Sequence, residues 1–179
     1  MNGAAFDDRL LDAAYALAAT HRLVDVQPPM LASAAGCDGR EFRERYPDLT
    51  ACLCAIQQRF MTRLRDRVLA AGLKQPAPFD RLKAGSLAYL DACLESRALR
   101  DWFVQARDEA HVLAAGLRRQ NQTYLVMLAP EFKSLAWPHP VEAARIFLAM
   151  LMEASLVEHV SGRALSDLRD TLWDYLQTY

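Results

Sequence analysis

The chain has 179 residues, which is enough for one or two small domains. Hydrophobic residues make up 53% of it and charged residues 24%, as in soluble globular proteins with a substantial core. No apolar run approaches the roughly 18 residues that a membrane-spanning helix needs, and the N-terminal stretch lacks the apolar core of a secretory signal. We therefore expect a cytoplasmic protein that does not enter a membrane.

The residue pattern offers no chemistry of the kind that enzymes use. The histidines are isolated, no Gly-rich phosphate loop occurs, and no nucleophile elbow surrounds a serine. The cysteines at positions 37, 52, 54 and 93 follow neither a disulfide framework nor the spacing of metal ligands. We expect no catalytic residue, no metal and no cofactor, and a thiol sensor at one of the cysteines is left as an alternative.

The apolar periodicity predicts an all-α protein of about nine helices. Few β-branched runs occur, which argues against sheets. The expected helices cover about residues 5–20, 28–35, 39–46, 49–71, 79–95, 98–105 and 107–128, a further stretch from 140 onward, and 165–179. The segment 129–140 contains three prolines and is expected to be irregular.

The second and third expected helices form a helix-turn-helix pattern. Gly36 lies where a helix C-terminus favours a residue that tolerates positive φ. Asp38 and Glu41 have the spacing of a capping box at the next helix. Phe42 and Tyr46 are four residues apart, so they share one face and are expected to pack inward. The second helix of such a motif can enter the major groove of DNA.

The segment 10–53 resembles the DNA-binding domain of the TetR family of bacterial regulators. The matching pieces are L-L-D-A-A-Y-A-L-A at 10–18, A-S-A-A-G at 32–36 and F-R-E-R-Y-P-D at 42–48, in the family's order and without a gap. The resemblance implies an N-terminal helix-turn-helix DNA-binding domain at residues 1–48. It also implies a helical effector-binding and dimerisation domain at 49–179.

By this resemblance, the expected function is that of a dimeric transcriptional regulator that acts as a repressor and responds to a small apolar or amphipathic ligand. The residues expected to face DNA are Gly39, Arg40, Arg43 and Arg45. The dimer is expected to form through the last two helices, because the helix after residue 140 has apolar residues on more than one side.

Several positions depart from the family pattern and weaken the expected contacts with DNA. Arg43 replaces a family Tyr, and Leu49 replaces a Lys that opens the fourth helix. Residues 1–55 also carry a formal net charge of −3, whereas a DNA-binding module usually shows a basic footprint. An alternative is therefore a TetR-like protein that has lost operator binding and acts through protein–protein interaction.

A ligand pocket is expected among the helices after residue 49, because the family encloses its effector there. Pockets combine apolar walls with a few placed polar groups. The expected lining residues are Phe60, Leu64, Trp102, Phe103, His111, Asn121, Tyr124, Met127, Phe147 and Met150. Glu153 is a further polar candidate. Arg59, Arg63 and Arg67 form a basic stripe, which is either a solvated face or a contact surface for DNA or a partner.

Overall fold

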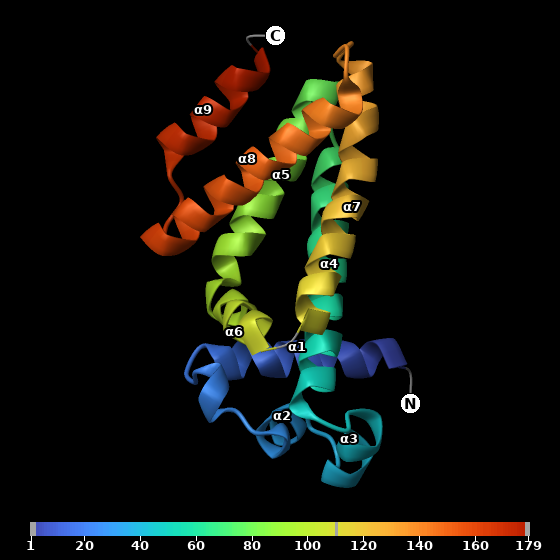
Figure 1. Ribbon diagram of the computed structural model, residues 1–179, viewed down its shortest axis with the longest axis vertical. Coiled ribbons are helices and arrows are strands. Elements are labelled where there is room, and N and C mark those ends of the chain that lie inside the picture. The colour runs from blue at the N-terminus through green and yellow to red at the C-terminus, as the bar shows by residue number, and fades with distance from the viewer. Residues whose placement is uncertain (1–2, 110, 178–179) are drawn as a thin grey trace. The chain divides into compact units, whose positions relative to one another are not determined.

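The computed structural model describes residues 3–109 and 111–177, and their side chains except those of residues 3–4, 106–109, 111–115 and 117. Within these ranges all regular structure is helical (Figure 1). The elements are α1 (Gly3–Ala18), η1 (Leu23–Asp25), α2 (Pro28–Ala34), α3 (Gly39–Arg45), α4 (Leu49–Gly72), α5 (Pro78–Glu95), α6 (Arg97–Glu109), α7 (His111–Ser134), α8 (Pro140–Ser161) and α9 (Ser166–Gln177). The predicted all-α class is confirmed, and no described helix is both long and apolar enough to span a bilayer.

The chain packs as two compact units. Among the described residues, the first contains 3–63, 98–109 and 111–118, and the second contains 64–97 and 119–177. The division falls inside α4, so this helix begins in the first unit and ends in the second.

The first unit is built on α1, which buries Phe6, Leu10 and Leu11. Helix α2 contacts both α1 and α3 (Figure 1). The predicted inward pair of α3 is confirmed, since Phe42 is 1% exposed and Tyr46 is 7% exposed. Their ring centroids lie 5.2 Å apart, a separation typical of packed aromatic pairs.

The turn between α2 and α3 is held by backbone hydrogen bonds of the Schellman type. The amide of Cys37 donates to the carbonyl of Ala32 and that of Gly36 to Ser33, at 3.0 and 3.1 Å. Gly36 has φ +62°, as predicted for this position. The Asp38 carboxylate caps α3 by accepting from the Arg40 amide at 2.6 Å, one residue earlier than the predicted capping box places the bond.

Helix α7 corrects the prediction for the segment 129–140, because it continues through Pro130 to Ser134. A proline in a helix leaves the carbonyl four residues before it without a partner. Here that residue is Val126, whose side chain is 75% exposed, so its turn of the helix faces solvent and water can satisfy the carbonyl. The irregular segment is therefore shorter than predicted.

The core of the second unit lies among α5, α7, α8 and α9. Helix α8 packs against both α5 and α9 (Figure 1). The residues that form this core are Leu82, Leu90, Phe132, Ala143, Ala144, Phe147, Leu151, Ala154, Leu172, Trp173 and Leu176. One face of the long, largely apolar helix α8 is thus buried in this core.

A buried ion pair ties the end of α8 to α9 and α5. Glu158 is 1% exposed and accepts from Arg169 at 2.7 and 2.9 Å and from the Leu165 amide at 2.9 Å. Arg169 also donates to Asp91 at 2.7 Å. Burial alone would raise the pKa of Glu158, but the hydrogen bonds hold it below its usual value, so the carboxyl stays ionised.

Candidate nucleic-acid interface and ligand cavity

Helix α3 exposes a short polar surface opposite its buried aromatic pair. Gly39, Arg40 and Arg43 all lie on exposed positions of this helix. A Cβ atom built on Gly39 would meet only the Arg43 guanidinium, at 3.5 Å, which is ordinary van der Waals contact. Nothing in the described chain therefore demands a glycine at this position for packing.

The three arginines of α3 are held in different ways. Arg40 pairs with Glu44 at 2.9 Å, and its side chain is 84% exposed. Among the described side chains, Arg43 has no ion pair or hydrogen-bond partner. Arg45 instead turns back toward α1, where it bonds to Asp7 at 2.9 Å and lies over the Phe6 ring, 4.6 Å from its centroid. Arg40 and Arg43 thus lie on the exposed surface with Gly39, whereas Arg45 makes its contacts inside the first unit.

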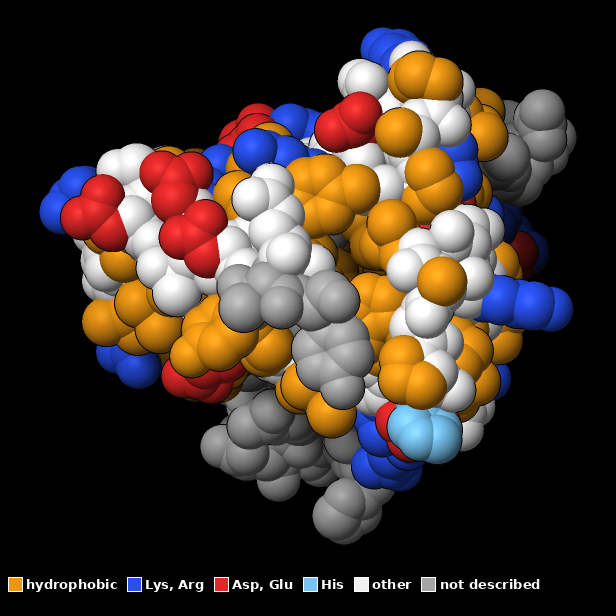
Figure 2. Space-filling view, turned by 90° about the horizontal axis from the view of Figure 1, so that it is seen from above, with side chains coloured by type: hydrophobic (Ala, Val, Ile, Leu, Met, Phe, Trp, Pro, Cys, Tyr) orange, Lys and Arg blue, Asp and Glu red, His pale blue; other side chains and the backbone are white. Residues whose placement is uncertain are grey.

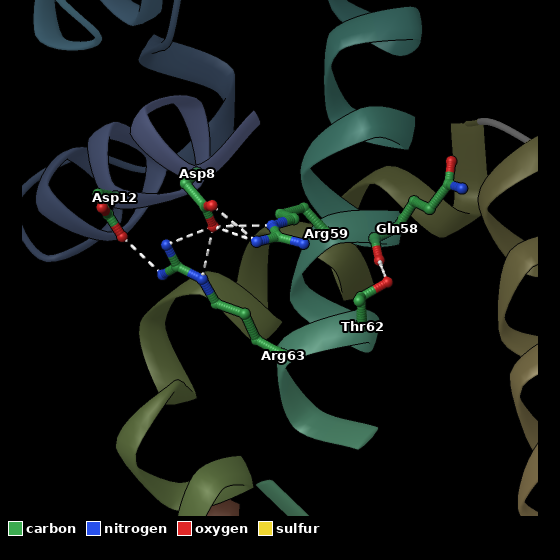
Figure 3. Close-up of polar contacts among 6 residues, drawn as sticks. All are labelled: Asp8, Asp12, Gln58, Arg59, Thr62 and Arg63. Carbon is green, nitrogen blue, oxygen red and sulfur yellow. Dashed lines mark hydrogen bonds and ion pairs between the residues drawn. The ribbon is translucent and has the colours of Figure 1, made fainter. Parts of the chain in front are cut away.

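Two acidic residues of α1, Asp8 and Asp12, are neutralised by arginines of α4 (Figure 3). Asp8 accepts from Arg59 at 2.7 Å and from Arg63 at 2.7 and 3.0 Å, and Arg63 also donates to Asp12 at 2.7 Å. The hydrogen bonds from Arg59 and then Arg63 hold the pKa of Asp8 below its ordinary value. Two arginines of the predicted basic stripe therefore join α4 to α1, which the sequence analysis missed.

The third arginine of that stripe, Arg67, pairs with Glu95 of α5. The stripe therefore makes internal ion pairs along its whole length. A signal was present in the sequence, because Asp8 and Asp12 are four residues apart on α1 just as Arg59 and Arg63 are on α4. Nothing in one sequence, however, showed that these two helix faces meet.

The thiols of the first unit are poorly suited to redox sensing. Burial raises the pKa of Cys52 to about 12, and burial also raises the pKa values of Cys37 and Cys54. Since the thiolate is the reactive form, these cysteines have little nucleophilic character near neutral pH. Among the described residues, no group of three or more His, Cys, Asp or Glu side chains is placed to hold a metal ion.

A cavity of about 110 Å³ lies in the second unit, between α4, α5, α7 and α8. Its apolar walls include Val68, Leu82, Leu148 and Leu151. Two of the predicted ligand-binding residues, Tyr124 and Met127, line it as well.

The other predicted ligand-binding residues lie in packed or surface positions. In the first unit, the Phe60 and Phe103 rings pack together at 5.7 Å, and Trp102 donates to the His21 carbonyl at 3.0 Å. In the second unit, Leu64 is buried, Phe147 is part of the core and Met150 packs against it, whereas Asn121 is half-buried and Glu153 is exposed on α8. The side chain of His111 lies outside the described residues.

Two polar atoms of α7 lack hydrogen-bond partners, and one of them belongs to Tyr124, which lines the cavity. The Tyr124 hydroxyl and the Gln120 side-chain nitrogen are both buried and neither makes a hydrogen bond of normal geometry. Burial raises the pKa of Tyr124, while the neighbouring Gln120 amide opposes that shift. The phenol therefore stays protonated and can donate a hydrogen bond at any physiological pH.

No protein-family model matches the sequence, and no curated protein does. Solved structures do match. A protein described as a TetR-family transcriptional regulator from Rhodococcus sp. has a TM-score of 0.79 and 16% identity, over 97% of this chain and 97% of that one. For a TetR-family transcriptional regulator from Streptomyces coelicolor the TM-score is 0.71, with 20% identity over 93% of this chain and 78% of that one.

A protein from Pseudomonas aeruginosa PAO1, described as a transcriptional regulator, has a TM-score of 0.75 and 16% identity, over 96% of this chain and 90% of that one. At such identities a match shows fold, and each of these matches extends over nearly all of this chain. The chain therefore has the fold of the TetR-family transcriptional regulators.

Proposed function

We propose that this protein is a TetR-family transcriptional regulator that binds DNA as a dimer, represses its target and responds to a small ligand. Residues 1–48 form the DNA-binding domain in this proposal, and residues 49–179 form the effector-binding and dimerisation domain. The observation that carries the proposal is the exposed face of α3, where Arg43 has no partner in the described chain and stands beside Gly39. Such a regulator acts in the cytoplasm and needs no enzymatic activity.

The charge distribution supports DNA binding better than the net charge suggests. Asp7, Asp8 and Asp12 are paired with arginines, and Asp38 and Asp48 accept hydrogen bonds at helix N-termini. These carboxylates belong to the internal structure of the unit. Arg43 and Arg40 can then approach phosphates or guanine edges with less opposition than the charge of −3 over residues 1–55 implies.

The first experiment is a titration of the purified protein against DNA from upstream of its own reading frame, with binding followed by fluorescence anisotropy. We expect Arg43→Ala to abolish detectable binding, because this side chain is available to DNA without breaking an internal contact. Arg163→Ala, an exposed arginine between α8 and α9, is the matched control and should bind as the wild type does. Equal binding by Arg43→Ala and wild type would refute the assignment of this residue.

A second titration varies the salt concentration. The half-buried Leu49 opens α4 at a position where family members place a phosphate contact, so Leu49→Lys should strengthen binding. Each restored phosphate contact should steepen the log–log dependence of affinity on salt by roughly 0.9. A slope that does not change would show that residue 49 lies away from the DNA backbone.

A protein–protein role without operator binding is the second candidate. It is favoured by Leu49 and by Glu41 and Glu44, which are exposed on the same short helix as the arginines. Under that reading neither the wild type nor Leu49→Lys binds DNA even at low salt.

The dimer in this proposal forms through α8 and α9. Their surface exposes apolar side chains at Val141, Ile146, Leu156, Val157, Val160 and Tyr175. Figure 2 shows broad apolar patches on the face seen there. Isolated exposed apolar residues are common, but a series along one helix is typical of an interface. Light scattering of the wild type at micromolar concentration tests the dimer directly.

A further inference from the structure

We propose that the cavity between α4, α5, α7 and α8 binds a small uncharged molecule, the size of a single six-membered ring, that carries a hydrogen-bond acceptor for Tyr124. The biological role of this site rests on the proposed regulatory function, whereas ligand binding itself does not.

The volume limits the ligand to a few heavy atoms. The cavity measures about 110 Å³, whereas pockets for drug-sized ligands hold roughly 300–1,000 Å³. An apolar cavity of about 150 Å³ in another protein accepts benzene. A single six-membered ring is therefore about the largest framework that this space takes without rearrangement of the helices.

The buried polar atoms determine the chemistry of the ligand. Tyr124 is 6% exposed and its hydroxyl has no hydrogen-bond partner of normal geometry, and neither has the Gln120 nitrogen, one helical turn before it. Both groups are donors, and a buried donor without a partner costs free energy. A ligand oxygen in the cavity that accepts from the Tyr124 hydroxyl removes that cost for the residue that lines the cavity.

The cavity offers no net charge to a ligand. Its two charged lining residues, Arg81 and Glu131, bind each other through hydrogen bonds of 2.9 and 3.0 Å. The hydrogen bonds that Arg81 donates to Glu131 are the main cause that raises the pKa of Arg81 above its usual value, so the pair stays ionised and mutually satisfied. An ionic ligand would have to break this pair, which favours a neutral carbonyl or ether over a carboxylate.

Two probes with the same number of heavy atoms distinguish the contribution of ligand size to binding from that of a hydrogen-bond acceptor. Cyclohexanone carries a carbonyl acceptor and toluene carries none. We expect both to bind the full-length protein by ligand-observed NMR and calorimetry, with cyclohexanone the tighter. Because the Tyr124 hydroxyl stays protonated, the affinity for cyclohexanone should not change between pH 6 and pH 9.

Tyr124→Phe removes the hydroxyl and keeps the shape of the ring. It should fold at least as well as the wild type, because it deletes a buried group without a partner. We expect it to weaken cyclohexanone binding about three- to tenfold, as for loss of one hydrogen bond, and to leave toluene binding unchanged. Tyr15→Phe, on α1 in the first unit, is the matched control and should bind both probes normally.

Met127→Trp fills the cavity from α7 and should abolish binding of both probes. The inference is overturned if the wild type binds neither probe, if Tyr124→Phe binds cyclohexanone as well as the wild type, or if Met127→Trp still binds. These outcomes are independent of the DNA titrations. If the protein binds cyclohexanone but no DNA, the proposed regulatory function is refuted and the ligand site stands. If it binds DNA but neither probe, only the ligand site is refuted.

Discussion

Arg43 and Arg45 are two residues apart on α3, yet their side chains have different surroundings. The guanidinium of Arg45 is held by Asp7 and lies over the Phe6 ring, whereas Arg43 has no partner in the described part of the chain. Both were expected on one DNA-facing surface, because the spacing of residues on α3 does not show which of them can reach α1. The difference lies in a contact between residues 38 positions apart in sequence.

This difference leads to a prediction about stability. Arg45→Ala loses a partly exposed ion pair and a cation–π contact, each of which contributes on the order of 0.5–1 kcal/mol. We therefore expect it to lower the free energy of unfolding by about 1–2 kcal/mol, measured by chemical denaturation. Arg43→Ala should leave that free energy unchanged to within about 0.5 kcal/mol. Equal losses in the two variants would show that Arg43 also has a structural partner.

At the scale of elements, the sequence predicted helix ends that are determined locally and missed those that depend on tertiary packing. The start of α2 at Pro28 and the turn at Gly36 follow from the φ preferences of these residues. The end of α7 does not, since it passes Pro130 and is fixed by Phe132, which is fully buried and packs edge-on against Trp137 at 5.2 Å. The two predicted ligand-binding residues that line the cavity, Tyr124 and Met127, both come from this helix.

The same helix end gives the second prediction. The turn after α7 has Schellman-type hydrogen bonds, with Ala136 at φ +60° where glycine is usual. A residue with a Cβ in this conformation is strained by roughly 1–2 kcal/mol. Ala136→Gly should therefore raise the free energy of unfolding by about 1 kcal/mol. Ala129→Gly, inside α7, is the control and should lower it by about 0.5–1 kcal/mol, and a loss in both variants would contradict the assigned strain.

The ion pairs between α1 and α4 give the third prediction. The pKa of Asp8 is lowered in the folded protein, so its contribution to stability is present above the unfolded pKa of about 3.9 and is lost as the pH falls through the lower, folded value. Asp8→Asn should flatten the acid limb of the stability–pH curve and should be less stable at neutral pH. Circular dichroism melting from pH 2 to pH 7 measures this, and parallel curves for variant and wild type would contradict it.

At the scale of the whole molecule, the proposed regulation needs a connection between α3, the helix proposed to face DNA, and the cavity. Helix α4 supplies a continuous one, because it begins at Leu49, just after α3, and its last turns line the cavity at Val68 and Gly72. A ligand changes DNA affinity only to the extent that it binds one arrangement of these helices better than another. The apolar periodicity of residues 49–71 predicted such a helix, but the position of the cavity depends on how four helices pack.

The fourth prediction concerns the contact between two copies. Arg145, Ala149 and Glu153 are four residues apart on the exposed face of α8, and neither charged residue has an ion-pair partner among the described side chains. If two copies meet with their α8 helices antiparallel across Ala149, symmetry places Arg145 of each copy opposite Glu153 of the other. The small alanine lets the helices approach, and two intermolecular ion pairs form at equal distances from the axis.

Variants that exchange the charges at positions 145 and 153 test this register, that is, the antiparallel pairing of two α8 helices across Ala149. Arg145→Glu alone, or Glu153→Arg alone, places like charges opposite each other twice and should raise the dimer dissociation constant at least about tenfold. The double variant restores opposite charges and should recover the wild-type constant, measured by sedimentation velocity over a range of protein concentrations. A monomeric wild type would refute the dimer. A dimeric wild type whose double variant is weaker than either single variant would refute only the register, since an interface elsewhere on α8 and α9 would bring these residues to other partners.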